Sequence, residues 1–460
     1  MSNRLQTLQA ALEHLKGGRF EQATVLCEPL LAADAGDTDA RFFLGVSLAA
    51  RGRLEDAMAH LTQVVRERPE HVDARRELAR MLIALGMMQV DRSRPDLAIP
   101  FFAQATGADG ANAIAAANLG NALATEGRFD EALAATNEAL RIAPADVDIH
   151  LNRSVTLLKA GRLLEGWSEN EWRLKKPGRE KLPAALKLPR LSTLPDGLRG
   201  RTVVIYHEEG FGDTIQFLRY ADLLSAAGAK VTAWMPEQLL RLVRGHKAIA
   251  ECLSGDVTLP RFDFHCPMNS LPYAFDTTLE AIPAAGAYIE AASDLAAAWN
   301  KELPTGRCRV GLVWAGEPRA YDPGAQALDR RRSISPDLLA PLTAVDGPTF
   351  VSLQTGAARM RMPPRLHDPM SKVKDFADTA AIVANLDLVV SVDTAVAHLA
   401  GAMGKPVFLL DRYDNCWRWL SGRTDSPWYP ALSIFRQPRM GDWAPAIAEA
   451  AEALEALARG

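Results

Sequence analysis

The sequence has few cysteines, and none of them is placed to form a recognisable site. Five occur in 460 residues, far apart in the chain: Cys27, Cys252, Cys266, Cys308 and Cys416. There is no CxxC pair, and no histidine is spaced from a cysteine in a way that suits zinc. A disulfide-rich scaffold and a structural zinc site are therefore excluded, and we expect reduced, partly buried thiols.

The chain also lacks an excess of charge and any long apolar run. It carries 52 Lys and Arg against 56 Asp and Glu, with a pI near 6.2, so it has no diffuse positive field for nucleic acid or anionic lipid. No apolar run reaches about 18 residues, and the N-terminus lacks a basic-then-apolar signal segment. We expect a cytoplasmic protein without a membrane span, whose partners are selected by local sites.

What the sequence does contain is a short repeat. Glycines recur at one constant interval at Gly18, Gly52 and Gly86, and at the same interval again at Gly127 and Gly161, with one longer interval between the two groups. Alanines repeat in the same way at Ala23, Ala57, Ala98 and Ala132, with the longer interval in the middle. The spacing predicts helix-turn-helix units, in which the glycine ends one helix and the alanine allows the next to pack closely. It also predicts a seven-residue insertion between Gly86 and Ala98.

The repeat resembles a known family. The constant interval is the period of about 34 residues that is typical of the tetratricopeptide repeat. Leu44-Gly45, Ala57 and Pro69, and again Leu119-Gly120, Ala132 and Pro144, resemble the sequence pattern of that repeat. The resemblance covers residues 4–165 as five units and implies an α-solenoid with a concave groove for a protein segment.

Two asparagines mark a candidate acceptor groove. Asn118 and Asn152 are one repeat apart on the first helices of successive units. An asparagine amide can meet both the donor and the acceptor of an extended peptide backbone. The alternative, that they are ordinary polar residues of such helices, is equally supported, because Phe43 and Glu77 hold the equivalent earlier positions.

The repeat pattern stops near Trp167. Residues 166–200 are rich in Lys, Arg, Pro and Gly, and we interpret them as a linker packed by its tryptophans. After residue 201, apolar strands alternate with helices, which predicts parallel sheets covered on both faces. The pattern restarts at Pro304, so we expect two Rossmann-like halves, residues 201–303 and 304–460, with a ligand cleft between them.

The two halves together resemble a family of transferases. The segments "EEGFGDTIQFLRY", "RVGLVWAG", "RRSI", "FVSLQTG", "SVDTAVAHLAGAMGKPV" and "GRTDSPWYP", in that order, resemble the heptosyltransferase-like glycosyltransferases of family nine. The resemblance covers nearly all of residues 200–445, and its most specific part is "SVDTAVAHLAGAMGKPV". It implies a GT-B fold, with the acceptor bound by the first half and a nucleotide sugar by the second, and no metal or other cofactor.

Asp213 is the candidate catalytic base. It follows the first predicted strand, where Gly210 and Gly212 allow the backbone to pass close to a substrate. A carboxylate there would take the proton of the attacking hydroxyl. An aspartate before a helix is also a good N-cap. Position alone supports both roles equally; the resemblance, in which this aspartate is the proposed base, favours catalysis.

The predicted donor side lies in the second half. Asp393 and Thr394 end a buried strand and begin a helix, whose N-terminus suits a phosphate. The resemblance places Asp393 against the sugar or ribose hydroxyls, and capping is the alternative. His398, one turn on, is predicted either to reach the cleft or to pack within the helix. Ala395 stands where relatives have glycine, which leaves less room for the donor.

Further donor contacts are expected in three loops. The forked guanidinium of an arginine suits phosphate oxygens, and Arg332-Ser333 matches the family's phosphate-contacting position in "LDRRRSI". Gln354 and Asp378 are predicted to lie in nucleotide-facing loops.

We therefore expect an inverting, metal-independent glycosyltransferase acting on a hydroxyl of a protein held by the repeats. Flagellin is one candidate acceptor, by analogy with related fusions. The alternative is a protein–protein adaptor with an inactive transferase domain. Adenine, uracil and cytosine nucleotides all remain open as the donor.

Overall fold

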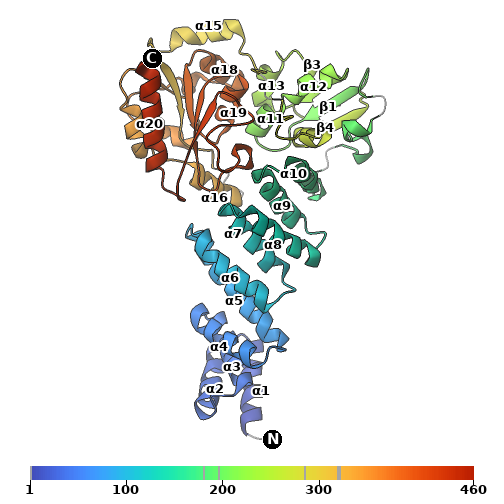
Figure 1. Ribbon diagram of the computed structural model, residues 1–460, viewed down its shortest axis with the longest axis vertical. Coiled ribbons are helices and arrows are strands. Elements are labelled where there is room, and N and C mark those ends of the chain that lie inside the picture. Colours follow the sequence, from blue (N-terminus) through green and yellow to red (C-terminus); the bar gives the residue numbers. More distant parts are fainter. Residues whose placement is uncertain (1–2, 180–181, 195–196, 284–285, 319–322, 460) are drawn as a thin grey trace. The chain divides into compact units, whose positions relative to one another are not determined.

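The structure, a computed structural model, describes residues 3–179, 182–194, 197–283, 286–318 and 323–459 (Figure 1). The chain forms two compact units, residues 1–156 and 157–460, and each is described by itself. All five cysteines are free thiols, as the sequence predicts. Among the described residues, no helix combines the length and apolar character that crossing a membrane requires.

The first unit consists of consecutive helix pairs (Figure 1). Its helices are α1 (Asn3–Lys16), α2 (Phe20–Ala33), α3 (Thr38–Ala50), α4 (Leu54–Glu67), α5 (Val72–Asp91), α6 (Pro95–Ala108), α7 (Ala113–Thr125), α8 (Phe129–Ile142) and most of α9 (Val147–Lys159). Gly18, Gly52 and Gly127 lie between the two helices of a pair with φ of 68°, 77° and 73°. Because this left-handed region strains residues with a Cβ atom, glycine is favoured there, and the predicted role of these glycines is confirmed.

Gly86 has a different role from the one its spacing suggested. It lies inside α5, where a Cβ atom would come within 2.5 Å of Phe102. The same close contact, sixteen residues along the chain, joins Gly45 to Leu61 and Gly120 to Thr136. Gly86 is therefore a packing residue between paired helices, and Ser93, with φ of 60°, occupies the left-handed turn position.

The seven-residue insertion lengthens α5. This helix has 20 residues, whereas α3 and α7 have 13 each, and in all three the packing glycine lies five residues before the helix end. The extra residues thus precede Gly86, and the prediction that they follow it was wrong. Seven residues make about two turns, so the packing face is kept. Counted from the glycine, Ala84 rather than Glu77 is equivalent to Asn118.

The second unit contains two all-parallel sheets (Figure 1). The first has the order β3 (Ile249–Leu253), β2 (Lys230–Trp234), β1 (Thr202–Tyr206) and β4 (Phe264–Pro267). The second has the order β10 (Leu432–Arg436), β9 (Val407–Asp411), β8 (Leu388–Val392), β5 (Arg309–Val313), β6 (Thr349–Ser352) and β7 (Leu366–His367). An α-solenoid followed by an α/β fold with two Rossmann-like sheets is confirmed.

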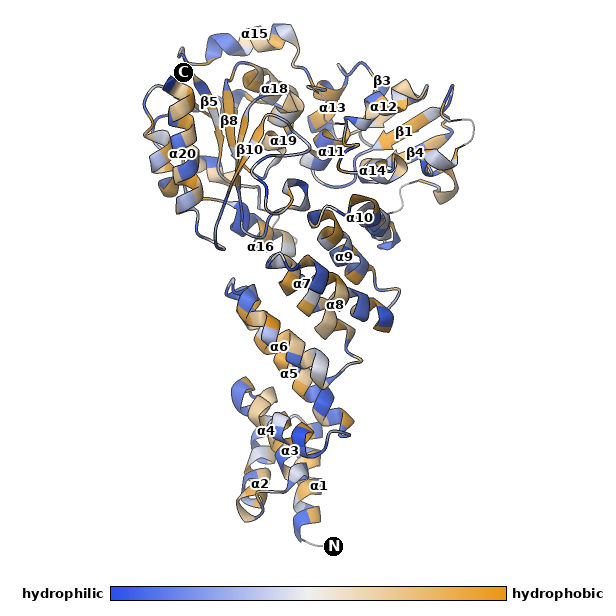
Figure 2. Cartoon of the chain, viewed as in Figure 1, coloured by the Kyte–Doolittle hydropathy of each residue, from blue (hydrophilic) through white to orange (hydrophobic). Residues whose placement is uncertain are grey.

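Helices cover both sheets. They are α11 (Phe211–Phe217), α12 (Tyr220–Ala226), α13 (Glu237–Val243), α14 (Leu271–Ala274), α15 (Ser293–Glu302), α16 (Pro323–Arg332), α17 (Ala340–Thr343), α18 (Phe376–Ala384), α19 (Ala395–Ala402) and α20 (Ala444–Arg459). The sequence analysis missed β3, β7 and β10. All three are edge strands, and partial exposure deprives them of the continuous apolar run that marks β1, β5 and β8 (Figure 2).

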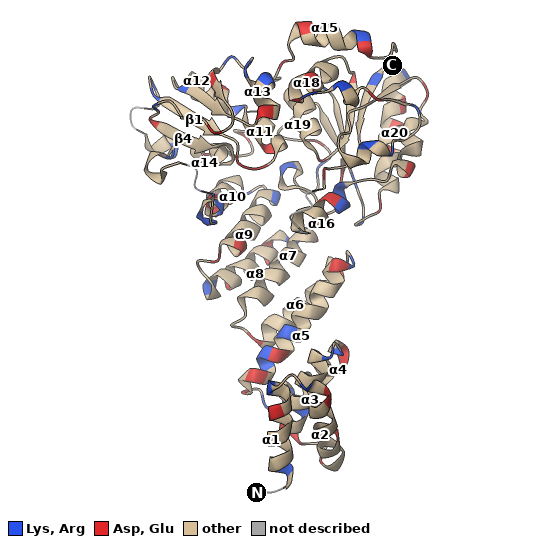
Figure 3. Cartoon of the chain, turned by 180° about the vertical axis from the view of Figure 1, so that it is seen from behind, with Lys and Arg blue, Asp and Glu red and all other residues tan. Residues whose placement is uncertain are grey.

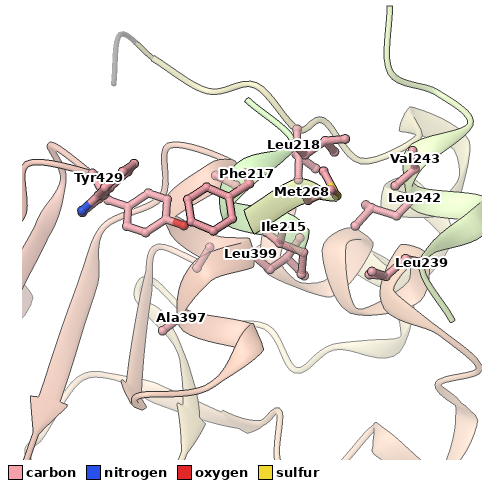
Figure 4. Close-up of a cluster of buried hydrophobic side chains, with 14 of the residues drawn as sticks. Ile215, Phe217, Leu218, Leu239, Leu242, Val243, Met268, Ala397, Leu399 and Tyr429 are labelled. Carbon is pink, nitrogen blue, oxygen red and sulfur yellow. The ribbon is translucent and has the colours of Figure 1, made fainter. Parts of the chain in front are cut away.

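The helices between the sheets share one hydrophobic core. Ile215 and Phe217 of α11 gather in one cluster with Leu239 of α13 and Leu399 of α19 (Figure 4). The same cluster reaches Val203 of β1 in the first sheet and other strand residues in the second. The two halves are therefore packed directly against each other through these helices.

The described residues between 166 and 200 include several that join this core. Trp167, in α10 (Leu163–Asn170), is 1% exposed, and its indole N–H donates to the carbonyl oxygen of Thr277 at 3.0 Å. Leu188 and Leu198 belong to the same core cluster. This segment thus stabilises the second unit.

Candidate functional site

The site begins where β1 gives way to α11. Gly210 is the N-cap of this helix, and Asp213 is its third residue. The Oδ2 atom of Asp213 accepts a hydrogen bond from the Gly210 backbone N–H at 2.9 Å. The prediction that the helix starts after Asp213 was therefore wrong by three residues. Gly210 occupies the cap position, and the carboxylate reaches back to it, as in one half of a capping box.

The other oxygen of Asp213 binds an arginine from the second half. Oδ1 forms an ion pair with Nη2 of Arg418, and the two side chains are only 21% and 12% exposed. Burial is the largest influence and opposes the charge of Arg418, but the attraction of the Asp213 and Asp393 carboxylates, together with the contacts to Cys416, outweighs it and raises the pKa of the guanidinium. This arginine was not predicted from the sequence, because nothing local marks its distant partner.

Gly212 allows α11 to touch α19. A Cβ atom at Gly212 would lie 2.7 Å from Cδ2 of His398 and 3.5 Å from Cα of Ala395. Gly212 thus faces the second sheet's half of this unit. Ala395 lies in the same contact.

His398 is buried within the site. Its Nδ1 lies 2.9 Å from the Tyr429 hydroxyl, and its ring stacks on Trp419 with 5.3 Å between centroids. Its Nε2 lies 3.8 Å from Oδ1 of Asp393. Burial lowers the pKa of His398 to about 3, and the charge of Arg418 adds to this effect. The imidazole is therefore neutral at physiological pH and packs against aromatic rings while reaching Asp393.

Asp393 and Thr394 lie at the carboxyl end of β8. Thr394 is the N-cap residue of α19, and its hydroxyl lies 3.1 Å from that of Ser391. The carbonyl oxygen of Asp393 accepts a hydrogen bond from Nη1 of Arg332 at 2.8 Å. The predicted donor residues Arg332, Asp393, Thr394 and His398 are thus brought together around the start of α19.

Arg332 lies in a helix rather than in the predicted loop. Arg330, Arg331 and Arg332 form the last turn of α16, where basic residues suit the helix dipole (Figure 3). Arg332 also pairs with Asp329. A Cβ atom at Gly316 would clash with the Arg332 guanidinium.

Ser333 and Gln354 support the backbone that follows β5. The hydroxyl oxygen of Ser333 accepts from the Gly316 N–H at 3.1 Å. The amide oxygen of Gln354 accepts from the N–H groups of Trp314 and Ala315 at 3.0 and 2.9 Å. Its amide nitrogen donates to the Ala315 carbonyl oxygen at 3.0 Å. Both the oxygen and the nitrogen of the Gln354 amide therefore have backbone partners. The contact of Gln354 with a donor stays a prediction.

Asp378 lies in the first turn of α18 rather than in the predicted loop, and it likewise has protein partners. Its carboxylate accepts from the Trp299 indole N–H at 3.1 Å and from the Lys374 backbone N–H at 3.0 Å. Arg241 lies 3.2 Å from it and 2.9 Å from Asp375. Arg241 belongs to α13 and the two acids to the α18 region, so these ion pairs join the two halves. The donor-binding role of Asp378 stays a prediction.

A charged cluster that the sequence analysis missed follows β9. Asp411 is fully buried and pairs with Arg436 at 2.9 Å, and burial raises the pKa of Asp411 to about 6. Arg331 and Arg412 each lie 2.9 Å from Oδ2 of Asp414. The sequence signal was "DRYD" at the end of an apolar strand, the edge at which parallel sheets bind ligands.

The two candidate groove residues lie in helices of the first unit. Asn118 is in α7 and Asn152 in α9, the first helices of successive pairs, and both side chains are half-buried. Their role in binding an acceptor stays a prediction. Among the described residues, no group of three or more His, Cys, Asp or Glu side chains is arranged to hold a metal ion, and metal independence also stays a prediction.

Comparison with protein families finds two matches. The tetratricopeptide repeat family matches residues 8–69 and 83–147. Glycosyltransferase family 9 (heptosyltransferase) matches residues 373–419. The second match spans Asp378, Asp393, Thr394, His398 and Arg418, and it indicates a glycosyltransferase domain.

Individual relatives were also found. Protein FlbA of Caulobacter vibrioides is 28% identical over 367 residues, which are 72% of this chain and 59% of FlbA. The chain thus spans about three fifths of this curated relative. Among solved structures, "MamA AMB-1 P212121" is 27% identical and covers 41% of this chain and 98% of its own, with a TM-score of 0.32. The repeat protein YrrB is 20% identical and covers 37% of this chain and 86% of its own, with a TM-score of 0.30.

Proposed function

We propose that this tetratricopeptide-repeat protein with a glycosyltransferase family 9 domain transfers a sugar from a nucleotide sugar to a hydroxyl of a protein acceptor. The observation that carries the proposal is a contact between the halves: Asp213, from the first half, pairs with Arg418 of the second, and the neighbouring Gly212 packs on His398. One half supplies a carboxylate for the acceptor, and the other supplies a helix start for a phosphate. A single displacement needs both.

In the proposed reaction, the acceptor oxygen attacks the anomeric carbon of the donor. Its proton passes to the Asp213 carboxylate as the bond between that carbon and the phosphate oxygen breaks. The nucleoside phosphate leaves with the electron pair of that bond. Because the acceptor oxygen attacks the face opposite the leaving phosphate, the configuration inverts. Thr394 and the first turn of α19 would stabilise the departing phosphate, with Arg332 beside them. The residues named here require no metal.

The repeats support a protein acceptor. A tetratricopeptide array offers an extended surface for a polypeptide, which a small sugar acceptor would not require. Flagellin is the first acceptor to test. The experiment for the function is a thermal-shift panel of ADP-, UDP-, GDP- and CMP-sugars, followed by measurement of nucleotide release from any sugar that raises the melting temperature.

A second candidate is an adaptor with an inactive transferase domain. Two observations favour it: α11 packs directly on α19 at Gly212, and Asp213 is already paired with Arg418. An adaptor would bind its protein partner but release no nucleotide from any member of the panel. A transferase would release nucleotide, and faster when the acceptor is present.

For the donor side, we expect Arg332→Ala and Thr394→Ala each to weaken nucleotide-sugar binding. Losing a hydrogen bond to a charged phosphate costs about 1–3 kcal/mol, which is about 5- to 150-fold in affinity. Calorimetric titration measures this effect. Arg330→Ala is the matched control, because Arg330 is exposed on the same helix. Unchanged affinity in both test variants would remove these residues from the donor site.

For the acceptor side, we expect the double change Asn118→Ala and Asn152→Ala to weaken binding of the acceptor protein. Each amide is proposed to pair with a peptide group, and a lost hydrogen bond costs about 0.5–1.5 kcal/mol. The two together predict about a tenfold loss in affinity, measured with full-length protein and flagellin. Asn137→Ala in α8 is the control, since Asn137 accepts from Arg153 within the unit. Equal affinities of the double variant and the control would contradict the groove assignment.

A further inference from the structure

Arg418 is attached to α11 at two points. Its Nη2 pairs with Asp213 and its Nε donates to the side-chain oxygen of Gln216, one turn further along the same helix. Its Nη1 lies 3.0 Å from Sγ of Cys416, and its guanidinium lies 4.2 Å from the centroid of the Trp417 ring. All three nitrogens of the guanidinium therefore have partners, so its position is fixed.

This arrangement fixes the carboxylate as well. Asp213 is held through Oδ2 by the Gly210 N–H and through Oδ1 by Arg418. A carboxylate oxygen has two lone pairs, so each oxygen keeps one that can accept a proton. The contacts orient Asp213 without using up its capacity as a base.

The charge of Arg418 also acts on the donor side. It attracts the Asp393 carboxylate and helps to keep His398 neutral. Because Arg418 and Asp213 are largely buried, their attraction is stronger than that of an exposed pair. Arg418 thus interacts electrostatically both with the predicted base and with the predicted donor residues.

We propose that Arg418 is the positioning residue for Asp213. This inference rests on the function proposed above. Before the transfer, the positive charge of Arg418 is balanced by the Asp213 carboxylate. During it, the acceptor proton neutralises that carboxylate while the breaking bond between carbon and phosphate oxygen leaves an added negative charge on the departing phosphate. Arg418 stays in place. Its positive charge is balanced by the Asp213 carboxylate before the step and by the departing phosphate after it.

The test compares Arg418→Ala and Arg418→Lys in the full chain, using the nucleotide sugar that responds in the thermal-shift panel. We expect Arg418→Ala to lower kcat about a hundredfold, because a misplaced catalytic group costs about that much. The KM for the donor should change less than threefold. Lysine keeps the charge but lacks the forked geometry, so Arg418→Lys should recover part of the lost kcat. Arg423→Ala is the control, since Arg423 forms an exposed pair with Asp425.

A double-mutant comparison separates positioning from a general structural role. If Arg418 acts through Asp213, Arg418→Ala should lower nucleotide release about a hundredfold in the native background but less than threefold in an Asp213→Asn background. Equal losses in both backgrounds would overturn the proposal, as would a native kcat in Arg418→Ala.

Failure of the proposed function can be distinguished from absence of the Asp213–Arg418 pair. If the native protein releases no nucleotide from any sugar, the transferase activity fails and the role of Arg418 in it fails too. Melting temperatures of the same four proteins still report whether the Asp213–Arg418 pair forms, because a contact makes the two changes non-additive. Additive shifts would show that the pair is absent in solution, which also overturns the proposal.

Discussion

Asp213→Asn is expected to lower turnover by about 10² to 10⁴, the usual contribution of a positioned general base. The asparagine oxygen can still accept from the Gly210 N–H, so the start of α11 should persist. The amide has no basic oxygen for the acceptor proton, which is why catalysis should fail. Nucleotide release at saturating donor measures the change, with donor affinity measured alongside.

The structure adds a stability cost to this substitution. The amide removes the anion that pairs with Arg418, and leaving a charged donor without its partner costs about 1–3 kcal/mol. Activity must therefore be compared below the lowered melting temperature. Asp222→Asn is a suitable control, because Asp222 is an exposed carboxylate in the same half. Native turnover in a folded Asp213→Asn variant would exclude the catalytic role. The carboxylate would then have only a structural role, through its contacts to Gly210 and Arg418.

Trp167→Ala is expected to destabilise the second unit by about 3–5 kcal/mol, the range for removing a buried aromatic side chain. The indole is 1% exposed and lies among the rings of Phe217, Trp417 and Trp428, with centroids 5.2–6.5 Å away. Its loss also leaves the Thr277 carbonyl oxygen without this donor. Denaturant unfolding of the full chain measures this change, as the free energy of the transition in which residues 157–460 unfold.

Trp172→Ala is the matched control for this change. Trp172 is half-buried, with the Lys175 ammonium 3.0 Å from its ring centroid. Truncating it removes less apolar surface from water, so the cost should be smaller. Equal losses of stability in the two variants would mean that α10 does not anchor the core. The expected difference would instead establish that this helix, which follows the repeat pattern, is part of the transferase core.

Much of the architecture could be predicted from the sequence, because it depends on periodic local patterns. The constant interval between repeats marks the helix pairs, and a left-handed turn favours glycine at Gly52 and Gly127 whatever their neighbours are. Continuous apolar runs mark β1, β5 and β8, since a strand buried on both faces has no polar side. Three of the four edge strands were missed, because exposure gives them a mixed composition.

The contacts of the candidate site depend on tertiary packing. Asp213 and Arg418 are 205 residues apart, so no local pattern joins them. A glycine spacing cannot distinguish Gly86, which packs on Phe102, from the glycines that end helices. Gln354 stands at the end of a strand, but its hydrogen bonds turn it toward the neighbouring backbone. Sequence determined most of the elements and their order, because these follow from local periodicity. Tertiary structure alone decided which side chains meet, because those contacts join residues that are distant in the chain.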